Sequence, residues 1–318
     1  MRQLGKTDIQ ITPVAMGCWP IAGMTSLNVN DIDSRKTLRA AVDSGINFFD
    51  TAYGYGRDGE SEKLIATELA DCRDKIVIAT KGGMHWDDSG RCFDACDQRL
   101  KAQCNESLRR LNTDHVDLLY LHAPDANVPV ADSAGTLKDL LDAGKTRSVG
   151  VSNFNVDQLN KFHAVCPISA VQPPYNMLQR DIESDVIPWC IQHDVACIIY
   201  WPLMKGLLAG RLGRDHVFGE GDGRPKYPMF QGEQWTKNQD FVDDLRAIAT
   251  DIGKTVAQLV VAWTVAQPGI TAALCGAKRD YQIQETAGAM GWEMDEATRQ
   301  RVADALKRRG QPETKPAV

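Results

Sequence analysis

Asn47-Phe48-Phe49-Asp50-Thr51-Ala52-Tyr53-Gly54-Tyr55-Gly56 is the stretch of sequence that decides the fold. An apolar run that begins at Ile46 ends abruptly at Asp50, and small, aromatic and glycine residues follow it. A barrel strand ends in this way where it meets its active-site loop. The stretch therefore predicts a buried strand over residues 46–50, with Asp50 at its carboxyl end and Tyr55 in the loop beyond.

The same pattern recurs along the chain. Short β-branched or aromatic runs end in polar or aromatic side chains at Lys81, His122, Ser152-Asn153, Gln172 and Tyr200. From residue 50 to residue 200 these strand ends are about 20 to 41 residues apart, which is the spacing of repeated strand and helix units. Each run is therefore predicted to be one strand of a single sheet.

Amphipathic segments separate the predicted strands. In residues 31–44, Leu38, Ala41 and Val42 share one helical face, and Gly45 follows as a C-cap. Alternating strands and helices indicate a parallel α/β sheet, which must close because an open doubly wound sheet would not bring every strand end to one site. We therefore predict a (β/α)8 TIM barrel, with an eighth strand near residues 271–275.

Composition limits the class of protein. A chain of 318 residues with 43% hydrophobic and 25% charged residues is ordinary for a globular protein, and one domain over residues 1–318 is expected. The first ten residues contain no apolar core of a signal peptide, and the longest apolar stretch, 197–204, is too short to span a bilayer. A soluble cytoplasmic protein is expected, with no membrane partner. The formal charge of -6 argues against a nucleic-acid partner.

Cysteine and histidine spacing gives no sign of a metal centre. The nine cysteines are odd in number and have no repeated spacing, so no disulfide framework is expected. Cys96, Leu100, Cys104 and Leu108 recur every four residues, as the buried stripe of a helix does. HExxH and paired-cysteine spacings are absent, and no metal is predicted.

Four ionisable groups stand at or just beyond successive strand ends: Asp50, Tyr55, Lys81 and His122. The carboxyl ends of parallel strands share one face of a barrel, so these groups are expected to converge and to move a proton, as the acid machinery of a reductase does. A free phenol titrates near pH ~10, and a Lys81 ammonium steadied by Asp50 is expected to favour the phenolate. Taken alone, Asp50 and Lys81 are equally consistent with a buried ion pair that braces two strands.

The chain resembles the aldo-keto reductase family. The similarity covers nearly its whole length, and eight motifs occur in family order at strand ends. They include Asp50 to Gly56, Lys81-Gly82-Gly83, Leu121-His122, Val149 to Phe154, Gln172 to Asn176, Tyr200 to Leu203, Gly206 to Gly210 and Gly276-Ala277-Lys278. The resemblance implies a barrel with an N-terminal β-hairpin and extra C-terminal helices. It also implies that Asp50, Tyr55, Lys81 and His122 form a catalytic tetrad for hydride transfer between NADPH and an aldehyde, ketone or sugar, with Tyr55 as general acid or base.

Cofactor contacts follow from the same resemblance. No GxGxxG motif stands between a strand and a helix, so a Rossmann domain is not supported. Ser152, Asn153 and Gln172 resemble the residues that bind the nicotinamide carboxamide, and Tyr200 resembles the aromatic residue that stacks on its ring. The pyrophosphate is expected at residues 201–211, with Trp201 and the backbone amides of Leu203 and Gly206 as contacts.

The adenosine end of the cofactor is expected after the eighth strand. Gly276 begins this stretch, Lys278 and Gln282 resemble the 2'-phosphate ligands, Glu285 resembles the adenine ligand, and Arg279 is a second basic candidate. A basic side chain at a helix N-terminus suits a phosphate, which favours NADPH over NADH. Two departures from the family pattern, Trp201 in place of a small hydroxyl residue and Thr286 in place of an asparagine, each put one cofactor contact in doubt.

The sequence suggests which residues line the substrate pocket but leaves more than one function possible. Trp19, Tyr53 and Trp86 are expected to wall a pocket for a small carbonyl substrate, within loops that include residues 84–94 and 212–235. Residues 219–228 are expected to be mobile and to fold over the dinucleotide. Two alternatives remain, a Schiff-base lyase that uses Lys81 and a cofactor-sensing subunit like the channel-associated family members. The sequence leaves the oligomeric state open and is compatible with a monomer.

Overall fold

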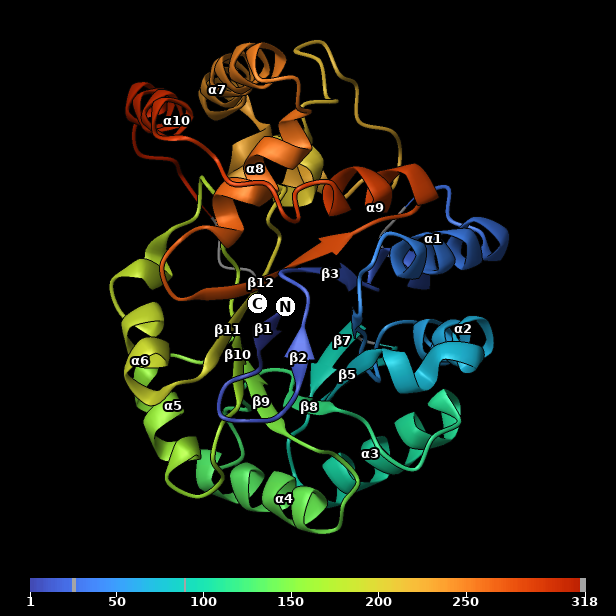
Figure 1. Ribbon diagram of the computed structural model, residues 1–318. Helices are drawn as coiled ribbons and strands as arrows, with labels where there is room; N and C mark the ends of the chain where they lie inside the picture. The colour runs from blue at the N-terminus through green and yellow to red at the C-terminus, as the bar shows by residue number, and fades with distance from the viewer. Residues whose placement is uncertain (25–26, 89, 315–318) are drawn as a thin grey trace.

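Eight parallel strands close into a barrel in the computed structural model, which describes residues 1–24, 27–88 and 90–314 (Figure 1). The barrel strands are β3 (Val14–Gly17), β4 (Phe48–Asp50), β5 (Val77–Gly82), β8 (Leu118–Leu121), β9 (Val149–Ser152), β10 (Ala170–Gln172), β11 (Ala196–Tyr200) and β12 (Ile270–Gly276). Each strand pairs in parallel with the next, and β12 returns to β3. The predicted TIM barrel is confirmed. The single domain predicted over residues 1–318 includes positions 25–26, 89 and 315–318, which lie outside the described residues.

Helices surround the barrel and complete the strand and helix units. They are α1 (Asp31–Asp43), α2 (Glu60–Glu68), α3 (Asp97–Leu111), α4 (Val130–Asp142), α5 (Val156–His163), α6 (Val186–His193), α8 (Val256–Val265) and α9 (Asp280–Ala287). Two further helices, α7 (Gly232–Asp251) and α10 (Glu296–Arg309), pack against each other outside this ring (Figure 1). Short 3-10 helices are η1 (Pro20–Ala22), η2 (Ala70–Lys75), η3 (Asp181–Glu183), η4 (Met204–Ala209), η5 (Arg224–Lys226) and η6 (Pro228–Phe230). None of the helices among the described residues is long and apolar enough to cross a membrane.

Apolar side chains pack in two layers because successive residues of a strand point to opposite faces. Phe48 belongs to the cluster inside the barrel, whereas Phe49 belongs to the layer between the strands and the helices. Leu100, Cys104 and Leu108 are buried on α3 as the helical stripe predicts. Cys96, the first member of that stripe, is instead the partly exposed residue that precedes the helix.

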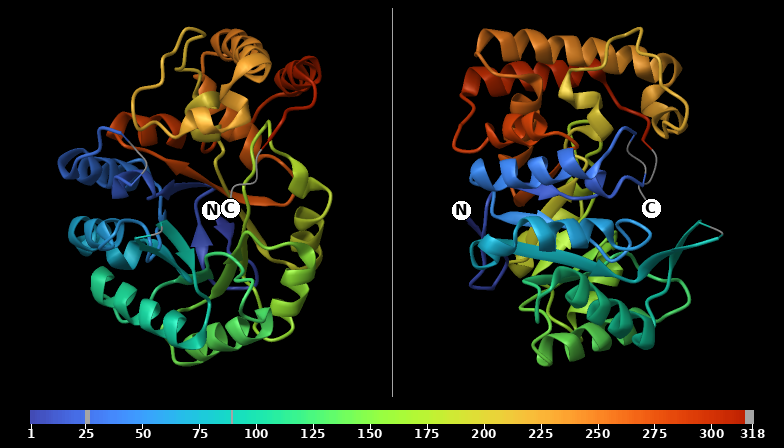
Figure 2. Two further views of the ribbon diagram at one scale, coloured as in Figure 1. Left: turned by 180° about the vertical axis from the view of Figure 1, so that it is seen from behind. Right: turned by 90° about the vertical axis from the view of Figure 1, so that its right-hand side faces the viewer.

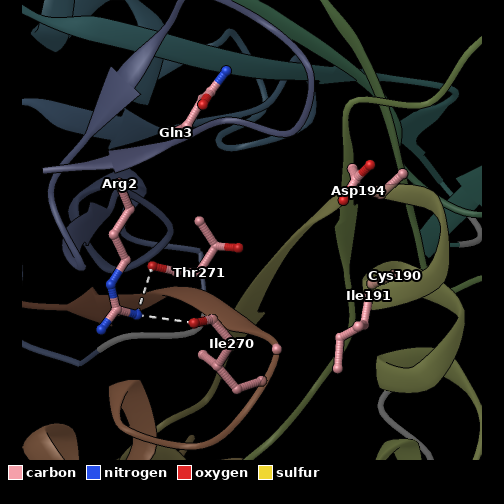
Figure 3. Close-up of a pocket in the computed structure, with 9 residues that line it drawn as sticks. Arg2, Gln3, Cys190, Ile191, Asp194, Ile270 and Thr271 are labelled. Carbon is pink, nitrogen blue, oxygen red and sulfur yellow. Dashed lines mark hydrogen bonds between the residues drawn. The ribbon is translucent and has the colours of Figure 1, made fainter.

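A hairpin covers the amino-terminal end of the barrel. Its strands are β1 (Arg2–Gln3) and β2 (Gln10–Ile11), which lie across the mouth in the centre of Figure 1. The Arg2 guanidinium donates to the carbonyl oxygens of Ile270 and Thr271 at 2.8 and 3.1 Å, which fixes the hairpin to the start of β12. A pocket of about 340 Å³ lies beside this anchor (Figure 3), and none of the four predicted catalytic residues lines it.

A second hairpin projects from the opposite end of the barrel. It consists of β6 (Met84–Asp87) and β7 (Gly90–Phe93), and the right view of Figure 2 shows it extending away from the amino-terminal end. The sequence predicted only a loop over residues 84–94. The hairpin was missed because its strands are short and contain no β-branched residue.

Candidate active site

The four predicted catalytic residues meet at the carboxyl ends of the strands. The Lys81 Nζ atom lies 2.5 Å from Asp50 Oδ1 and 3.1 Å from the Tyr55 hydroxyl oxygen. It also donates to the Thr51 carbonyl oxygen at 2.9 Å. Three acceptors around one nitrogen match the three protons of an ammonium group. The side chains of Lys81 and Asp50 are 1% and 2% exposed, so this cation is held almost wholly out of water.

Strand pairing brings Tyr55 back over Lys81. β4 runs beside β5, and the ladder continues past Asp50 because the Tyr53 amide donates to the Lys81 carbonyl oxygen at 3.0 Å. The chain then turns, and the Tyr55 amide donates to the Ala52 carbonyl oxygen at 3.0 Å. Gly54 lies in this turn, where a Cβ atom would come within 2.6 Å of the Met84 sulfur atom. A side chain at residue 54 would therefore force the Met84 side chain of the second hairpin to move.

His122 completes the group from the strand beside Lys81. Its ring lies edge-on to the Tyr55 ring at a centroid distance of 5.8 Å. The Nδ1 atom is buried and has no hydrogen-bond partner among the described residues. Enclosure of the ring, the charge of Lys81 and the charge of Arg91 lower the pKa of His122 well below its usual value. The imidazole is therefore neutral at pH 7 and has one N–H group to donate.

The pKa of Tyr55 moves in the direction opposite to the expectation from sequence. Protein atoms packed around the hydroxyl raise this pKa well above its usual value, and the negative charge of Asp50 raises it further. Burial also raises the pKa of Asp50 and lowers that of Lys81, while the opposite charge at 2.5 Å works against both shifts. Tyr55 is thus a protonated phenol at neutral pH, in the form that an acid needs, and the Lys81 ammonium is next to the oxygen that would become negative.

Hydrogen bonds connect the predicted carboxamide ligands to these residues. Gln172 Nε2 donates to the second oxygen of Asp50 at 2.7 Å, and the Ser152 hydroxyl donates to the Gln172 carbonyl oxygen at 2.8 Å. Asn153 Nδ2 donates to Ser152 Oγ at 3.0 Å, and the Tyr200 hydroxyl donates to Asn153 Oδ1 at 2.7 Å. The structure therefore brings all four residues into one network with Asp50.

Aromatic residues stand on the outer side of Tyr55. The Trp19 ring lies 4.9 Å from the Tyr55 ring and 6.5 Å from the Trp86 ring, measured between centroids. Trp86 is fixed by a hydrogen bond from its indole nitrogen to the Gly54 carbonyl oxygen at 2.9 Å. Tyr53 is placed differently, because its ring lies 4.5 Å from the Arg110 guanidinium of α3. The structure thus groups Trp19 and Trp86 with Tyr55 and places the Tyr53 ring against a helix.

The segment after β11, residues 201–210, has an unusual backbone. Trp201, Met204 and Lys205 all have positive φ angles, of 62°, 44° and 54°. Non-glycine residues with such angles are uncommon, and they cluster at ligand-binding sites. The Gly206 amide donates to the Leu203 carbonyl oxygen at 2.9 Å, which closes a turn in this segment.

Lys205 is a cation that sequence reasoning missed. Its ammonium lies 4.0 Å from the Trp201 ring and 4.6 Å from the Tyr227 ring, and no carboxylate pairs with it among the described residues. Burial and the nearby charge of Arg91 lower the pKa of Lys205 to about 8. A lysine in a glycine-containing loop is normally exposed to water. Lys205 is partly buried through its contact with Tyr227, which is distant in sequence, so the sequence around Lys205 does not reveal its burial.

At the start of α9 the predicted adenosine ligands lie close together. The Gln282 side chain accepts hydrogen bonds from the Lys278 and Arg279 amides at 2.8 and 3.2 Å, so it caps the helix. Arg279 pairs with Asp33 at 3.3 Å, and Lys278 Nζ donates to the Leu27 carbonyl oxygen at 3.1 Å. Burial and the charges of two arginines, one of them Arg279, lower the pKa of Lys278.

Three further predicted positions lie around these residues. Glu285 forms an ion pair with Arg211 at 2.8 Å, and the Thr286 hydroxyl donates to carbonyl oxygens of its own helix. Gly276 is exposed at the end of β12, beside Gly17 of β3. Arg224, from the segment predicted to fold over the cofactor, pairs with Asp222 and is the second arginine whose charge acts on Lys278.

Comparison with known proteins identifies the same architecture and chemistry elsewhere. A family model described as the aldo/keto reductase family matches residues 13–307. The aldo-keto reductase YhdN of Bacillus subtilis (strain 168) is 35% identical over 295 residues, which cover 92% of this chain and 89% of the relative. The NADH-specific methylglyoxal reductase of Escherichia coli (strain K12) is 29% identical and covers 96% of this chain and 98% of its own length.

A solved structure agrees with this similarity over the full fold. The glycerol dehydrogenase of Gluconobacter oxydans superposes with a TM-score of 0.91 and 33% sequence identity. The match covers 100% of this chain and 98% of the dehydrogenase. The similarity therefore includes both hairpin-bearing ends of the barrel and the helices outside it.

Proposed function

Because this chain belongs to the aldo-keto reductase family, we propose that it reduces the carbonyl group of an aldehyde, ketone or sugar, or oxidises the corresponding alcohol, with Tyr55 as general acid or base. Bound NADPH supplies the hydride that its nicotinamide C4 transfers to the carbonyl carbon. The observation that carries the proposal is the contact of Lys81 Nζ with both Asp50, at 2.5 Å, and the Tyr55 hydroxyl, at 3.1 Å.

The proton transfer follows from the charges around Tyr55. The phenol is protonated at neutral pH because its pKa is raised, so it can donate to a carbonyl oxygen that gains negative charge. The phenolate left behind is stabilised by the ammonium 3.1 Å away. Asp50 and Thr51 hold that ammonium in place through two of its three protons. In the reverse direction, the phenolate form of Tyr55 accepts the alcohol proton.

His122 positions the carbonyl group in this proposal. A neutral imidazole donates one N–H hydrogen bond and adds no second cation beside Lys81. Its ring stands edge-on to Tyr55, so both side chains can contact one oxygen atom. Trp19 and Trp86 form apolar walls next to Tyr55 and would cover the substrate side of the site.

The residues present fit a nicotinamide dinucleotide. The amide and hydroxyl groups of Ser152, Asn153 and Gln172 lie in one network with Asp50, and Tyr200 stands at its end. Lys205 is a half-buried cation with no carboxylate partner among the described residues, which is an arrangement that an anionic pyrophosphate would compensate. We assign the carboxamide to the first three residues and the pyrophosphate to residues 201–206.

Preference for NADPH rests on the charges near α9. Burial and then the charges of Arg224 and Arg279 lower the pKa of Lys278, so the three cations lie close together. Such mutual repulsion decreases when a dianionic phosphate binds between the cations. A relative at 29% identity is named NADH-specific, so the measured preference decides this part of the proposal.

Lys81 is poorly suited to a Schiff-base reaction. An amine nucleophile must be free of its protons, but Lys81 donates to three oxygen atoms and is 1% exposed. A cofactor-sensing subunit would keep the same residues, so turnover is the property that separates it from an enzyme.

The test is a steady-state assay of NADPH and NADH oxidation with a panel of aldehydes, ketones and sugars. We expect many cycles per protein molecule with NADPH and a catalytic efficiency at least about tenfold lower with NADH, the effect of about one charge-assisted contact. Oxidation that stops after one equivalent would favour a sensor. A borohydride-trapped adduct on Lys81 would favour a lyase.

A further inference from the structure

The hairpin β6–β7 carries three metal-ligating side chains on one face. His85 stands directly opposite Cys92 in the antiparallel register, and Asp87 is two residues beyond His85. Side chains two residues apart on a strand share a face. As a result the donor atoms of His85, Asp87 and Cys92 all lie within 4.8 Å of one another, in a group found among the described residues.

The other face of the hairpin belongs to the active site. Trp86 lies between His85 and Asp87 on β6, and it is paired across the strands with Arg91, which directly precedes Cys92. Trp86 donates to the Gly54 carbonyl oxygen and lies beside Trp19, while the charge of Arg91 acts on His122. The cluster of His85, Asp87 and Cys92 is therefore separate from the residues proposed to bind substrate, but it lies on the same two strands.

One contact within the cluster and one unpartnered ring nitrogen point to a cation. The Cys92 thiol lies 3.1 Å from Asp87 Oδ2, so a sulfur atom and a carboxylate are already adjacent. The Nδ1 atom of His85 is buried and has no hydrogen-bond partner among the residues described. A buried ring nitrogen without a protein partner is uncommon, and coordination of a metal ion would supply that partner.

We propose that His85, Asp87 and Cys92 form a binding site for Zn²⁺. Nitrogen, oxygen and thiolate sulfur are all zinc ligands, and a borderline-soft ion accepts the three together. Three protein ligands leave the fourth tetrahedral position to water. When the ion binds, the Cys92 thiol loses its proton to solvent and the sulfur atom takes up the metal bond in its place.

The geometry requires only a small adjustment of the hairpin. Zinc bonds of about 2.0 to 2.3 Å place tetrahedral ligand atoms roughly 3.3 to 3.8 Å apart. Donor atoms that lie within 4.8 Å of one another reach these separations through side-chain rotation. The bound ion links β6 to β7 and thereby restrains Trp86 and Arg91 on the opposite face. Sequence spacing did not reveal the site because cross-strand pairing brings Cys92 to His85.

The site is tested with Co²⁺ and Zn²⁺ on the full chain after treatment with a chelator. We expect one equivalent of Co²⁺ to bind with a thiolate-to-cobalt charge-transfer band, and one equivalent of Zn²⁺ to displace it. Cys92→Ser removes the band, and His85→Gln weakens binding by more than about a hundredfold, since even outer-shell changes cost about 10- to 100-fold. Cys96→Ser is the matched control, because Cys96 is a second partly exposed cysteine near the hairpin.

Three results would overturn the proposal: no charge-transfer band in the unmodified chain, a band that persists in Cys92→Ser, or equal loss in Cys96→Ser. Hydrogen exchange gives a second readout that does not depend on the charge-transfer band. Zn²⁺ should slow exchange of the amides in residues 84–87 and 90–93 in the unmodified chain and not in Cys92→Ser. If Zn²⁺ does not change amide exchange in the unmodified chain, the proposal that the ion restrains the hairpin is wrong. None of these measurements requires turnover, so they are independent of the proposed reductase function.

Discussion

Two buried carboxylates at opposite ends of the barrel have different surroundings. Asp50 lies at the carboxyl end of β4 and Asp117 directly precedes β8, and their side chains are 2% and 4% exposed. Asp117 accepts from the Ile78 amide at 2.9 Å and pairs with Arg73 and Arg147 at 3.0 and 2.9 Å. Both aspartates therefore link neighbouring segments of the barrel and are neutralised by buried or partly buried cations.

The cations beside them make the difference. A guanidinium keeps its protons at all ordinary pH values, so the contacts of Asp117 can only hold the amino-terminal end together. Lys81, the partner of Asp50, reaches a second titratable group, the phenol of Tyr55. A buried ion pair can therefore take part in proton transfer when its cation also contacts a group that can give up a proton.

The largest expected effect comes from removing that group. Tyr55→Phe deletes the proton donor and keeps the ring, so we expect kcat/KM to fall by about 10²- to 10⁴-fold, the usual share of general acid catalysis. Cofactor affinity, measured by fluorescence titration, should change by less than about twofold, because it depends on other contacts.

Tyr53→Phe is the matched control for Tyr55→Phe. Its ring contacts Arg110 and not Lys81, so activity should stay near that of the unmodified chain. Equal losses in the two variants would remove the distinction between Tyr55 and an ordinary packed tyrosine.

The second largest effect should appear at the other end of the barrel, in stability. Asp117→Ala leaves the buried Ile78 amide without its acceptor, so the free energy of unfolding should fall by about 1 to 3 kcal/mol while kcat is unchanged. Urea unfolding and the carbonyl assay measure the two quantities. Asp8→Ala, an exposed partner of the same Arg147, should change stability far less. A lower kcat at full stability would contradict the structural role of Asp117.

Sequence alone predicted the barrel and the grouping of the tetrad. Both follow from one rule, that the polar residue after each buried strand lies at a common end, and the contacts of Lys81 with Asp50 and Tyr55 agree with it. No such rule predicts the direction in which the side chain of a loop residue points. Tyr53 and Tyr55 are two residues apart, but the turn at Gly54 sends one ring to Arg110 and the other to Lys81.

The sequence also could not predict pKa values that depend on how deeply a side chain is buried. The pKa of Tyr55 is raised because atoms pack around its hydroxyl and because the charge of Asp50 is nearby, and no spacing rule reports how tightly a loop closes. Lys205 is enclosed through contact with Tyr227, a residue of a long loop whose position depends on the rest of the fold. Sequence patterns locate strand ends, whereas long-range packing decides the charge state of the groups found there.

A smaller effect is expected from substitution of Lys205, at the carboxyl-terminal end of the barrel. Lys205→Met keeps the length of the side chain and removes its charge, so the dissociation constant for NADPH should rise about tenfold, as expected for one partly screened charge-assisted contact. The effect should weaken above pH 8, because the pKa of Lys205 is lowered to about 8 and the unmodified side chain then loses its proton.

Lys254→Met is the matched control for Lys205→Met. Lys254 also lies over an aromatic ring, that of Trp292, at 5.3 Å, and it stands outside the proposed cofactor contacts. Its loss should leave NADPH affinity unchanged. Equal affinities of the Lys205 variant and the unmodified chain would remove Lys205 from the proposed pyrophosphate site.

The smallest expected effect is a change in the pH dependence of stability. The pKa of His122 is held well below 6.5 in the folded chain, so as pH falls below 6.5 the unfolded chain takes up a proton that the folded chain does not. Stability therefore decreases through this range, and at about pH 5.5 the contribution of one such group is about 1 kcal/mol. His122→Gln should flatten the acid side of a plot of unfolding free energy against pH by this amount, whatever its effect at pH 7. His163→Gln should flatten it less, since burial lowers the pKa of His163 less far. Parallel curves for His122→Gln and the unmodified chain would mean that the imidazole is protonated in the folded state, and the neutral donor assigned to the active site would then be wrong.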